Sequence, residues 1–125
     1  MKILLAEDDE NISVISRMVL EKIGKHEVHW VSDGEQALDA ALSDEHYDVI
    51  LLDEMMPKMN GLKVAKEYRS KCIDPTPIIF LSAKSQKDEI DKFLNEGSGF
   101  ISKPFDPNQL CQLIEEILVS QKKAI

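Results

Sequence analysis

The chain has 125 residues, of which 43% are hydrophobic and 30% charged, a composition typical of a single globular domain spanning residues 1–125. Its 23 acidic and 15 basic side chains give a net charge of −8. Because affinity for DNA comes largely from Lys and Arg side chains that neutralise phosphates, this excess of acid leads us to expect no direct binding of nucleic acid. No apolar run approaches the roughly 18 residues that cross a membrane, and the opening MKILLAEDDE turns acidic too early for a signal peptide, so we expect a cytoplasmic protein without membrane contact.

Short apolar runs alternate with segments of helical periodicity along the whole chain. The runs cover residues 3–6, 28–31, 49–52, 78–81 and, more weakly, 100–101. Between and after them, apolar residues recur on one helical face, most clearly in residues 110–118. Successive runs begin about 20 to 30 residues apart, which leaves room for a crossover helix. The pattern predicts five parallel strands, each followed by a helix.

The sequence also carries signals for where helices start. Ser32 followed by Glu35 matches a capping box, in which Ser32 is the N-cap and the Glu35 carboxylate reaches back to it. Asp106 followed by Pro107 is typical of an acidic cap with proline at the first helical position. Ser85 is the cap that we expect for the fourth helix.

The composition of the apolar runs predicts their order in the sheet. The first, third and fourth are continuously apolar, as are strands covered on both faces. The second, which contains His29 and Trp30, is more mixed, and the fifth is very short, so these two belong at the edges. The predicted fold is an α/β doubly wound sheet of flavodoxin-like order 2-1-3-4-5 with five helices.

Polar residues follow the ends of four of the predicted strands. They are the acidic run 7–10, then Asp53, Ser82 and Lys103. Taken singly, these residues have ordinary explanations: a helix start, a turn, a strand end and a solvated charge. However, the carboxyl ends of parallel strands meet at one rim, and ligands bind there at the switch point between the first and third strands. We therefore expect these side chains to converge.

The converging residue types indicate a specific chemistry. Carboxylates of Asp8, Asp9 and Asp53 would repel one another, and a hard divalent cation relieves that repulsion. Oxygen ligands favour Mg²⁺, or Mn²⁺, over zinc. Lys103 can pair with Asp53 and later with a phosphoryl oxygen, to which the Ser82 hydroxyl can also donate. The parts predict phosphoryl transfer to Asp53.

Four stretches resemble the receiver domain of bacterial two-component response regulators, over essentially the whole chain. MKILLAEDDE is similar to the family's first strand and acidic pocket, and LLDEMMPKMNG to its phosphoacceptor turn. FLSAK and ISKPF are similar to its Ser/Thr and Lys-Pro motifs. The resemblance implies a CheY-like fold. It also implies a signalling switch and not an enzyme, because such a switch catalyses only its own phosphorylation and its own slow dephosphorylation.

The resemblance also implies a role for each matching residue in the acidic pocket. Asp53 would be phosphorylated by a histidine kinase or a histidine phosphotransfer protein, and Lys103 would contact the phosphoryl group. Asp53 and Asp9 would bind Mg²⁺ directly and Asp8 mainly through water. The backbone carbonyl of Met55 would be a further ligand.

Outside that pocket, the resemblance implies a cis peptide between Lys103 and Pro104, with Ser82 as switch hydroxyl and Phe100 as switch aromatic. Downstream protein partners, and a dimer linked to phosphorylation, would use the face formed by the fourth helix, fifth strand and fifth helix, roughly residues 85–120. Phe100 departs from the more usual Tyr in lacking a phenol. Glu54 places a charge where the family often has an apolar residue, and we expect it to point outward.

Two other functions compete with a phosphorylated switch. A receiver fold can serve as an interaction module that works without phosphorylation, but such a module need not keep all of Asp8, Asp9, Asp53, Ser82 and Lys103. A flavodoxin-like cofactor enzyme would need a loop rich in Gly, Ser or Thr after its first strand to bind phosphate. The acidic run 7–10 stands there instead and would repel a phosphate that has no metal.

Overall fold

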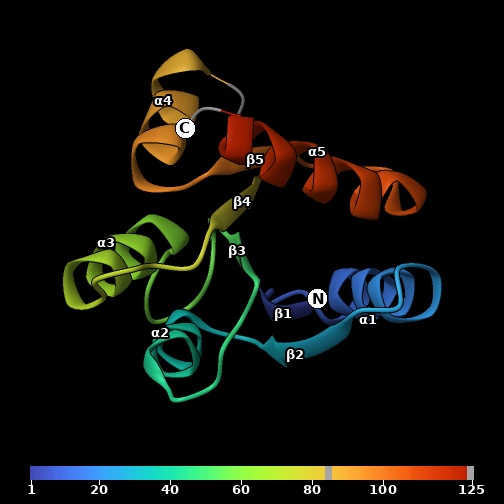
Figure 1. Ribbon diagram of the computed structural model, residues 1–125, viewed down its shortest axis with the longest axis horizontal. Helices are drawn as coiled ribbons and strands as arrows, with labels where there is room; N and C mark the ends of the chain where they lie inside the picture. Colours follow the sequence, from blue (N-terminus) through green and yellow to red (C-terminus); the bar gives the residue numbers. More distant parts are fainter. Residues whose placement is uncertain (84–85, 124–125) are drawn as a thin grey trace.

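The computed structural model describes residues 1–83 and 86–123, which form a five-stranded parallel sheet flanked by helices (Figure 1). The strands are β1 Lys2–Ala6, β2 Glu27–Val31, β3 Val49–Asp53, β4 Ile78–Ser82 and β5 Gly99–Ser102. Their order is β2-β1-β3-β4-β5, and every neighbouring pair is parallel. The predicted fold class and strand order are confirmed.

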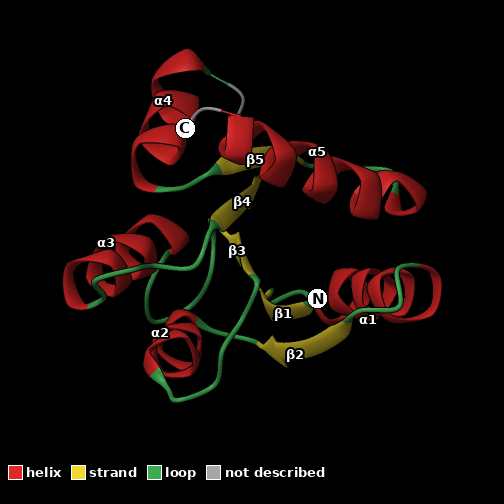
Figure 2. Ribbon diagram, in the orientation of Figure 1, coloured by secondary structure: helices red, strands yellow, loops and turns green. Residues whose placement is uncertain are grey.

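Helices cover both faces of this sheet (Figure 2). They are α1 Glu10–Met18, continued by a π-helical turn Val19–Ile23, then α2 Gly34–Leu42, α3 Gly61–Lys71, α4 Lys87–Glu96, and α5 Leu110–Lys123 after a 3-10 turn Pro107–Gln109. In Figure 1, α1 and α5 lie on one side of the sheet, whereas α2, α3 and α4 lie on the other. None of the described helices has both the length and the apolar character needed to cross a bilayer.

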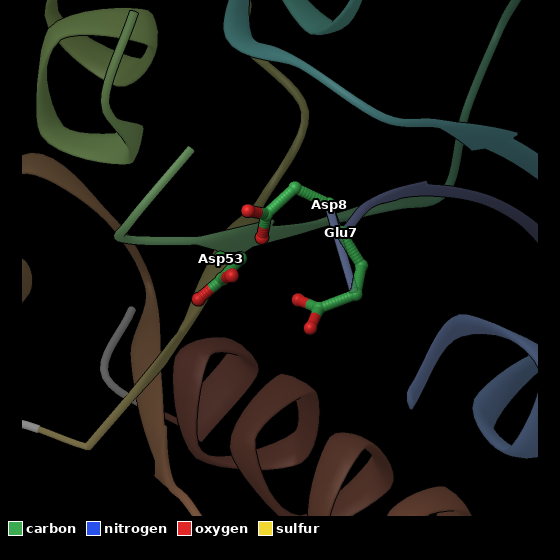
Figure 3. A group of neighbouring side chains, drawn as sticks. All are labelled: Glu7, Asp8 and Asp53. Atoms are coloured by element: carbon green, nitrogen blue, oxygen red, sulfur yellow. The ribbon is translucent and has the colours of Figure 1, made fainter. Parts of the chain in front are cut away.

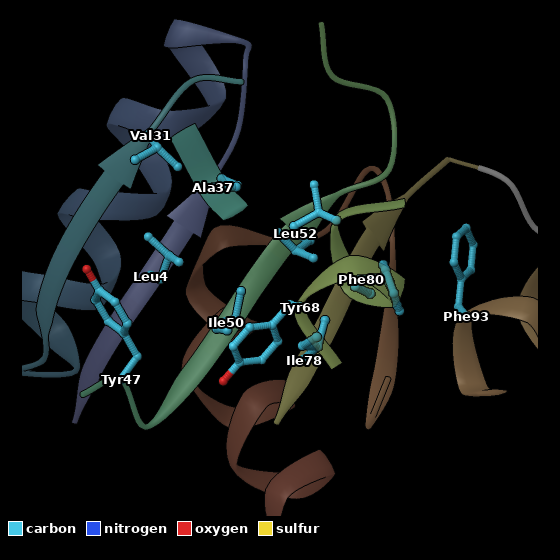
Figure 4. Close-up of a cluster of buried hydrophobic side chains, with 13 residues drawn as sticks. Leu4, Val31, Ala37, Tyr47, Ile50, Leu52, Tyr68, Ile78, Phe80 and Phe93 are labelled. Carbon is cyan, nitrogen blue, oxygen red and sulfur yellow. The ribbon is translucent and has the colours of Figure 1, made fainter. Parts of the chain in front are cut away.

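The three central strands bury side chains on both faces, as their continuous apolar runs predict. On the α2–α4 side, Leu4 and Ile50 belong to a cluster that includes Tyr68 of α3 (Figure 4). On the α1–α5 side, Leu5 and Leu51 belong to a second cluster. This two-sided burial holds β1, β3 and β4 at the centre of the sheet, so their carboxyl ends lie next to one another at a single rim.

The helix starts differ from the prediction in one detail. Asp33, and not Ser32, is the N-cap of α2, because the Asp33 carboxylate accepts the Gln36 N–H at 2.8 Å. The side-chain oxygen of Gln36 in turn accepts the backbone N–H of Ser32 at 3.0 Å. The predicted cap at Asp106 is confirmed, since its carboxylate accepts a backbone N–H two residues on at 3.0 Å. Ser85 lies outside the described residues.

The first residue of α2 packs against the loop that follows β3. The Gly34 N–H donates to the carbonyl of Pro57 at 3.2 Å, and a Cβ atom at Gly34 would lie 1.9 Å from the carbonyl oxygen of Met59. Within the same loop Lys58 adopts a φ of 70°, and its ammonium lies 3.7 Å from a carboxylate oxygen of Asp33. Only glycine permits this close approach of two backbones.

Gly34→Ala is expected to destabilise the protein, because the added methyl group collides with a backbone carbonyl and cannot be relieved by rotating a side chain. The expected loss in the free energy of unfolding is about 1–3 kcal/mol, measured by urea denaturation. Asp39→Ala, at an exposed position of the same helix, is the control and should stay within about 0.5 kcal/mol of wild type. A Gly34→Ala protein as stable as this control would contradict the packing described here.

Candidate functional site

Asp53 is the last residue of β3 and lies at the rim, buried to 5% exposure. In the pairing of β3 with β4, Asp53 lies opposite Leu81. The backbone N–H of the next residue, Glu54, donates to the Leu81 carbonyl at 3.0 Å. A Cβ atom at Gly61 would lie 2.7 Å from the Asp53 carbonyl oxygen, so the start of α3 presses closely against this turn. The backbone of Asp53 is therefore held between β4 on one side and the start of α3 on the other.

Two acidic residues from the end of β1 lie beside Asp53. The β1–β3 register pairs Ala6 with Leu52, so Glu7 is one position further on, level with Asp53. Glu7, Asp8 and Asp53 each offer a carboxylate oxygen, and these atoms lie within 4.8 Å of one another (Figure 3). Glu7 is 1% exposed, whereas Asp8 is open to solvent. The three residues form what we call the acidic group.

Lys103 brings a positive charge into this group from the end of β5. Its Nζ lies 3.0 Å and 3.1 Å from the two carboxylate oxygens of Glu7, and 3.0 Å from Oδ1 of Asp53. The Lys103 backbone N–H donates to the Ser82 carbonyl at 2.8 Å, and the Lys103–Pro104 peptide is cis, as the family resemblance implied. One ammonium group therefore contacts two buried carboxylates.

The charges in the acidic group do not balance, and the pKa values reflect this. Burial, together with hydrogen bonding and repulsion from Asp53, raises the pKa of Glu7 to about 8, although Lys103 opposes the shift. Burial and the same contact with Asp53 raise the pKa of Asp8. Burial alone would lower the pKa of Lys103, but Asp53 and Glu7 outweigh it and raise that pKa. The arrangement favours either a bound proton or a bound cation.

Asp9 does not join this group, which corrects our expectation that Asp8 and Asp9 would be the pair beside Asp53. Helix α1 begins at Glu10, so Asp9 is its N-cap, and Oδ1 of Asp9 accepts the N–H groups of Asn11 and Ile12 at 2.9 and 3.1 Å. The residue that sequence reasoning missed as a site residue is Glu7. Its signal was the register: β1 ends at Ala6, so the first acid of the run, and not the second, lies level with Asp53.

Two further predicted residues, Ser82 and Phe100, lie on β4, which neighbours β3, and on β5, which neighbours β4. Ser82 ends β4, one position beyond the partner of Asp53, and is 2% exposed. Phe100 lies on β5, and its ring stacks on Phe93 of α4 with centroids 5.5 Å apart and planes 9° apart. Phe80 of β4 contacts the same Phe93 ring at 5.0 Å between centroids. β4, which ends at Ser82, and β5, which is followed by Lys103, therefore also carry the aromatic contacts with α4.

A cleft of about 520 Å³ adjoins Asp8 and is lined by the segment after Asp53, from Glu54 to Pro57, and by Asn60. Met55 within it is 66% exposed. Glu54, which we expected to point outward, is instead only 4% exposed. Its backbone extends the β3–β4 ladder, and its carbonyl accepts the Gly61 N–H at 3.0 Å. The cleft gives the acidic group an opening to solvent on the Asp8 side.

The raised pKa of Glu7 predicts how the stability of the metal-free protein depends on pH. The folded state keeps a proton on Glu7 up to about pH 8, whereas the unfolded chain releases it near pH 4.5. The bound proton therefore makes its full contribution to the free energy of unfolding below about pH 4.5, and this contribution is lost as the pH rises through about 8. Glu7→Gln, which keeps a neutral side chain at every pH, should remove this loss.

Urea denaturation in EDTA at about pH 5 and about pH 9 provides the measurement. Between these two pH values, the free energy of unfolding of wild type should fall on the order of a few kcal/mol more than that of Glu7→Gln, since one pKa unit corresponds to about 1.4 kcal/mol. Glu10→Gln makes the same chemical change at an exposed neighbour and should leave the wild-type profile unchanged. Equal pH dependence in wild type and Glu7→Gln would contradict the assignment of this proton to Glu7.

Comparison with known proteins adds independent information about this site. The family model described as response regulator receiver domain matches residues 3–115. The transcriptional regulatory protein RprY of Bacteroides fragilis is 39% identical over 119 residues, which make up 94% of this chain and 49% of that protein. The chain spans about half the length of the curated relatives it matches.

Solved structures show the same architecture. The receiver domain of the Francisella response regulator 1452 has a TM-score of 0.83 and 28% identity, covering 96% of this chain and 98% of that one. The receiver domain of the sensor histidine kinase PA1611 of Pseudomonas aeruginosa, with a magnesium ion coordinated in its active site cleft, has a TM-score of 0.79 and 28% identity, covering 92% and 94%. Because the family model spans nearly the whole chain and the fold agrees, the chain belongs to the receiver domains of two-component response regulators.

Proposed function

We propose that residues 1–125 form one receiver domain that accepts a phosphoryl group on Asp53, in a Mg²⁺-dependent reaction, from a histidine kinase or a histidine phosphotransfer protein. The observation that carries this proposal is the buried Asp53 carboxylate, 3.0 Å from the Lys103 ammonium and within the acidic group. The family's role in signalling favours the cytoplasm as its compartment. The domain would act as a switch, and its only chemistry would be its own phosphorylation and slow dephosphorylation.

The donor atoms fit a hard divalent cation. Carboxylate oxygens of Glu7, Asp8 and Asp53 lie within 4.8 Å of one another, and oxygen-only sites favour Mg²⁺ or Mn²⁺. We assign these carboxylates as the metal-binding set, with Asp8 nearest solvent, and keep the Met55 carbonyl as the further ligand that the resemblance implies. Glu7 replaces Asp9 in this set, because Asp9 caps α1. When bound, Mg²⁺ would neutralise charge on the transferring phosphoryl group.

The protein's own residues would perform the transfer. A carboxylate oxygen of Asp53 attacks the phosphorus, the bond between phosphorus and the donor's imidazole nitrogen breaks, and the imidazole leaves as the acyl phosphate forms. Lys103 already contacts Asp53 and would pair with an oxygen of the phosphoryl group. The register of β3 and β4 places Ser82 on the adjacent strand, where its hydroxyl would donate to another of these oxygens.

Phosphorylation would act on the α4–β5–α5 face through Ser82 and Phe100. The Phe100 ring stacks on Phe93 of α4, and it has no phenol to bind water or a partner, so its position depends on packing alone. Movement of Ser82 toward the phosphoryl group would open space for Phe100 and shift α4 and β5. This requires two arrangements separated by a few kcal/mol, of which the downstream partner, or a second copy of the chain, binds one better.

The curated relatives are named as transcriptional regulatory proteins, and the chain corresponds to about half of their length. We propose that residues 1–125 do not themselves contact nucleic acid, because their net charge of −8 opposes binding to phosphates. Regulation of a downstream protein by the α4–β5–α5 face is the role that this chain would contribute.

Incubation with acetyl phosphate and Mg²⁺, followed by intact-mass measurement, tests the proposed function. Wild type should gain the mass of one phosphoryl group, and Asp53→Asn should gain none, because the amide cannot form an acyl phosphate. Asp39→Asn makes the same change at an exposed site on α2 and should behave as wild type. A phosphohistidine donor protein should be used as a second donor. Failure of wild type with both donors would refute the proposal and leave a phosphorylation-independent interaction module.

Paired substitutions of Asp8 and Asp9 test the assignment of the metal site. Asp8→Asn should weaken Mg²⁺ binding by about tenfold or more, because it removes a charged ligand. Asp9→Asn should change the affinity by no more than about twofold, because Asn caps a helix as well as Asp does. Calorimetric titration with Mg²⁺ measures both. A loss for Asp9→Asn as large as that for Asp8→Asn would overturn the revised ligand set.

A further inference from the structure

Trp30, the only tryptophan in the chain, reaches the acidic group from the edge strand β2. Its indole Nε1–H donates to the backbone carbonyl of Glu7 at 2.9 Å. The β1–β2 ladder ends with the pair Ala6 and Val31, beyond which the Glu7 N–H still donates to the Val31 carbonyl at 3.1 Å. The Glu7 carbonyl lies past the end of this ladder, and the Trp30 side chain supplies its donor.

That hydrogen bond acts on the peptide group that joins Glu7 to Asp8. A peptide is planar, so fixing its oxygen fixes the orientation of the whole unit and of the two Cα atoms that it links. The carboxylate of Glu7 contacts Lys103, and that of Asp8 belongs to the acidic group (Figure 3). A rotation of this one peptide would therefore displace two of the three acids relative to Asp53.

The indole is itself held in place from helix α1. The guanidinium carbon of Arg17 lies 4.5 Å from the centroid of the Trp30 ring, a cation–π contact. Arg17 is anchored in turn, since its Nε donates to the Ser13 carbonyl at 3.3 Å. Trp30 also packs, with Val28 from the same strand, against the apolar cluster on the α1–α5 face. The donor group thus has a defined position, although it lies on an edge strand.

We infer that Trp30 is a positioning residue for the acidic group: its indole N–H, under the Arg17 guanidinium, orients the Glu7–Asp8 peptide so that the Glu7 carboxylate faces Lys103 and the Asp8 carboxylate lies beside Asp53. The inference rests on the proposed function, because it gives this hydrogen bond a consequence for Mg²⁺ binding and phosphoryl acceptance. This positioning role differs from a packing role, in which the ring of Trp30 would affect the site and its N–H group would not.

Two substitutions on β2 separate positioning from packing. Trp30→Phe removes the N–H donor and keeps an aromatic ring for Arg17 to cover. Val28→Ala removes apolar contacts with the same cluster and leaves the donor intact. Calorimetry gives the Mg²⁺ affinity, intact mass gives the initial rate of phosphoryl gain from acetyl phosphate, and thermal unfolding gives the Tm of each protein.

Trp30→Phe should weaken Mg²⁺ binding about 3- to 10-fold, the size expected for one lost hydrogen bond, and should slow phosphoryl gain at limiting Mg²⁺. Saturating Mg²⁺ should restore much of the rate. Val28→Ala should lower the Tm but keep an affinity within about twofold of wild type, since distant sites act independently. Equal affinities for Trp30→Phe and wild type, or equal losses for Trp30→Phe and Val28→Ala, would overturn the inference.

Replacing Trp30 by 3-benzothienylalanine keeps the size and shape of the ring while sulfur takes the place of N–H, so this protein tests the inference even if Trp30→Phe fails to fold. It should show the same loss of affinity with a Tm close to that of wild type. If wild type binds Mg²⁺ and accepts the phosphoryl group, and the sulfur variant matches it in both, only the inference fails. If wild type does neither, the proposed function fails and the inference fails with it.

Discussion

The contact of the Lys103 ammonium with the buried carboxylates of Glu7 and Asp53 is the interaction on which the site depends. Charges removed from water are costly unless they are paired, and here one lysine faces two buried acids with Asp8 alongside. Burial first, and then the contact with Asp53, raises the pKa of both Glu7 and Asp8, so the unfavourable charge is shared by the group and does not belong to one residue. A rim with this imbalance favours a bound proton or a bound cation.

The sheet can hold this unfavourable arrangement because the apolar strands beneath it are fixed from both sides. β3 buries every residue from Val49 to Asp53, and the register aligns Ala6 with Leu52, so the positions of Glu7 and Asp53 follow from the backbone. Packing of the two apolar clusters supplies the stability that offsets the crowded charges at the rim. The acids therefore need not attract one another to stay together.

Much of this fold and part of this site could be predicted from sequence, for reasons that differ between residues. Continuous apolar runs identified the central strands, and Asp53 and Ser82 were identified because they directly follow two of these runs. Lys103 was identified from its place after the short edge run 100–101. The acidic run after β1 was misassigned by one position, since a run of four acids does not show where the strand stops and the cap begins. The inward Glu54 and the bond from Trp30 depend on tertiary contacts, which no local pattern encodes.

The connection from the rim to α4 follows from the pairing of the last two strands. Ser82 pairs with Ser102, next to Lys103, and two positions earlier Phe80 pairs with Phe100. Both of these rings contact Phe93 of α4. Residues two apart on a strand share a face, so in the proposed switch a displacement of the Ser82 end of β4 would be transmitted along one face toward the aromatic contact. Packed aromatic rings have few alternative arrangements, and a small shift at the rim would therefore favour a discrete change in α4 over a gradual one.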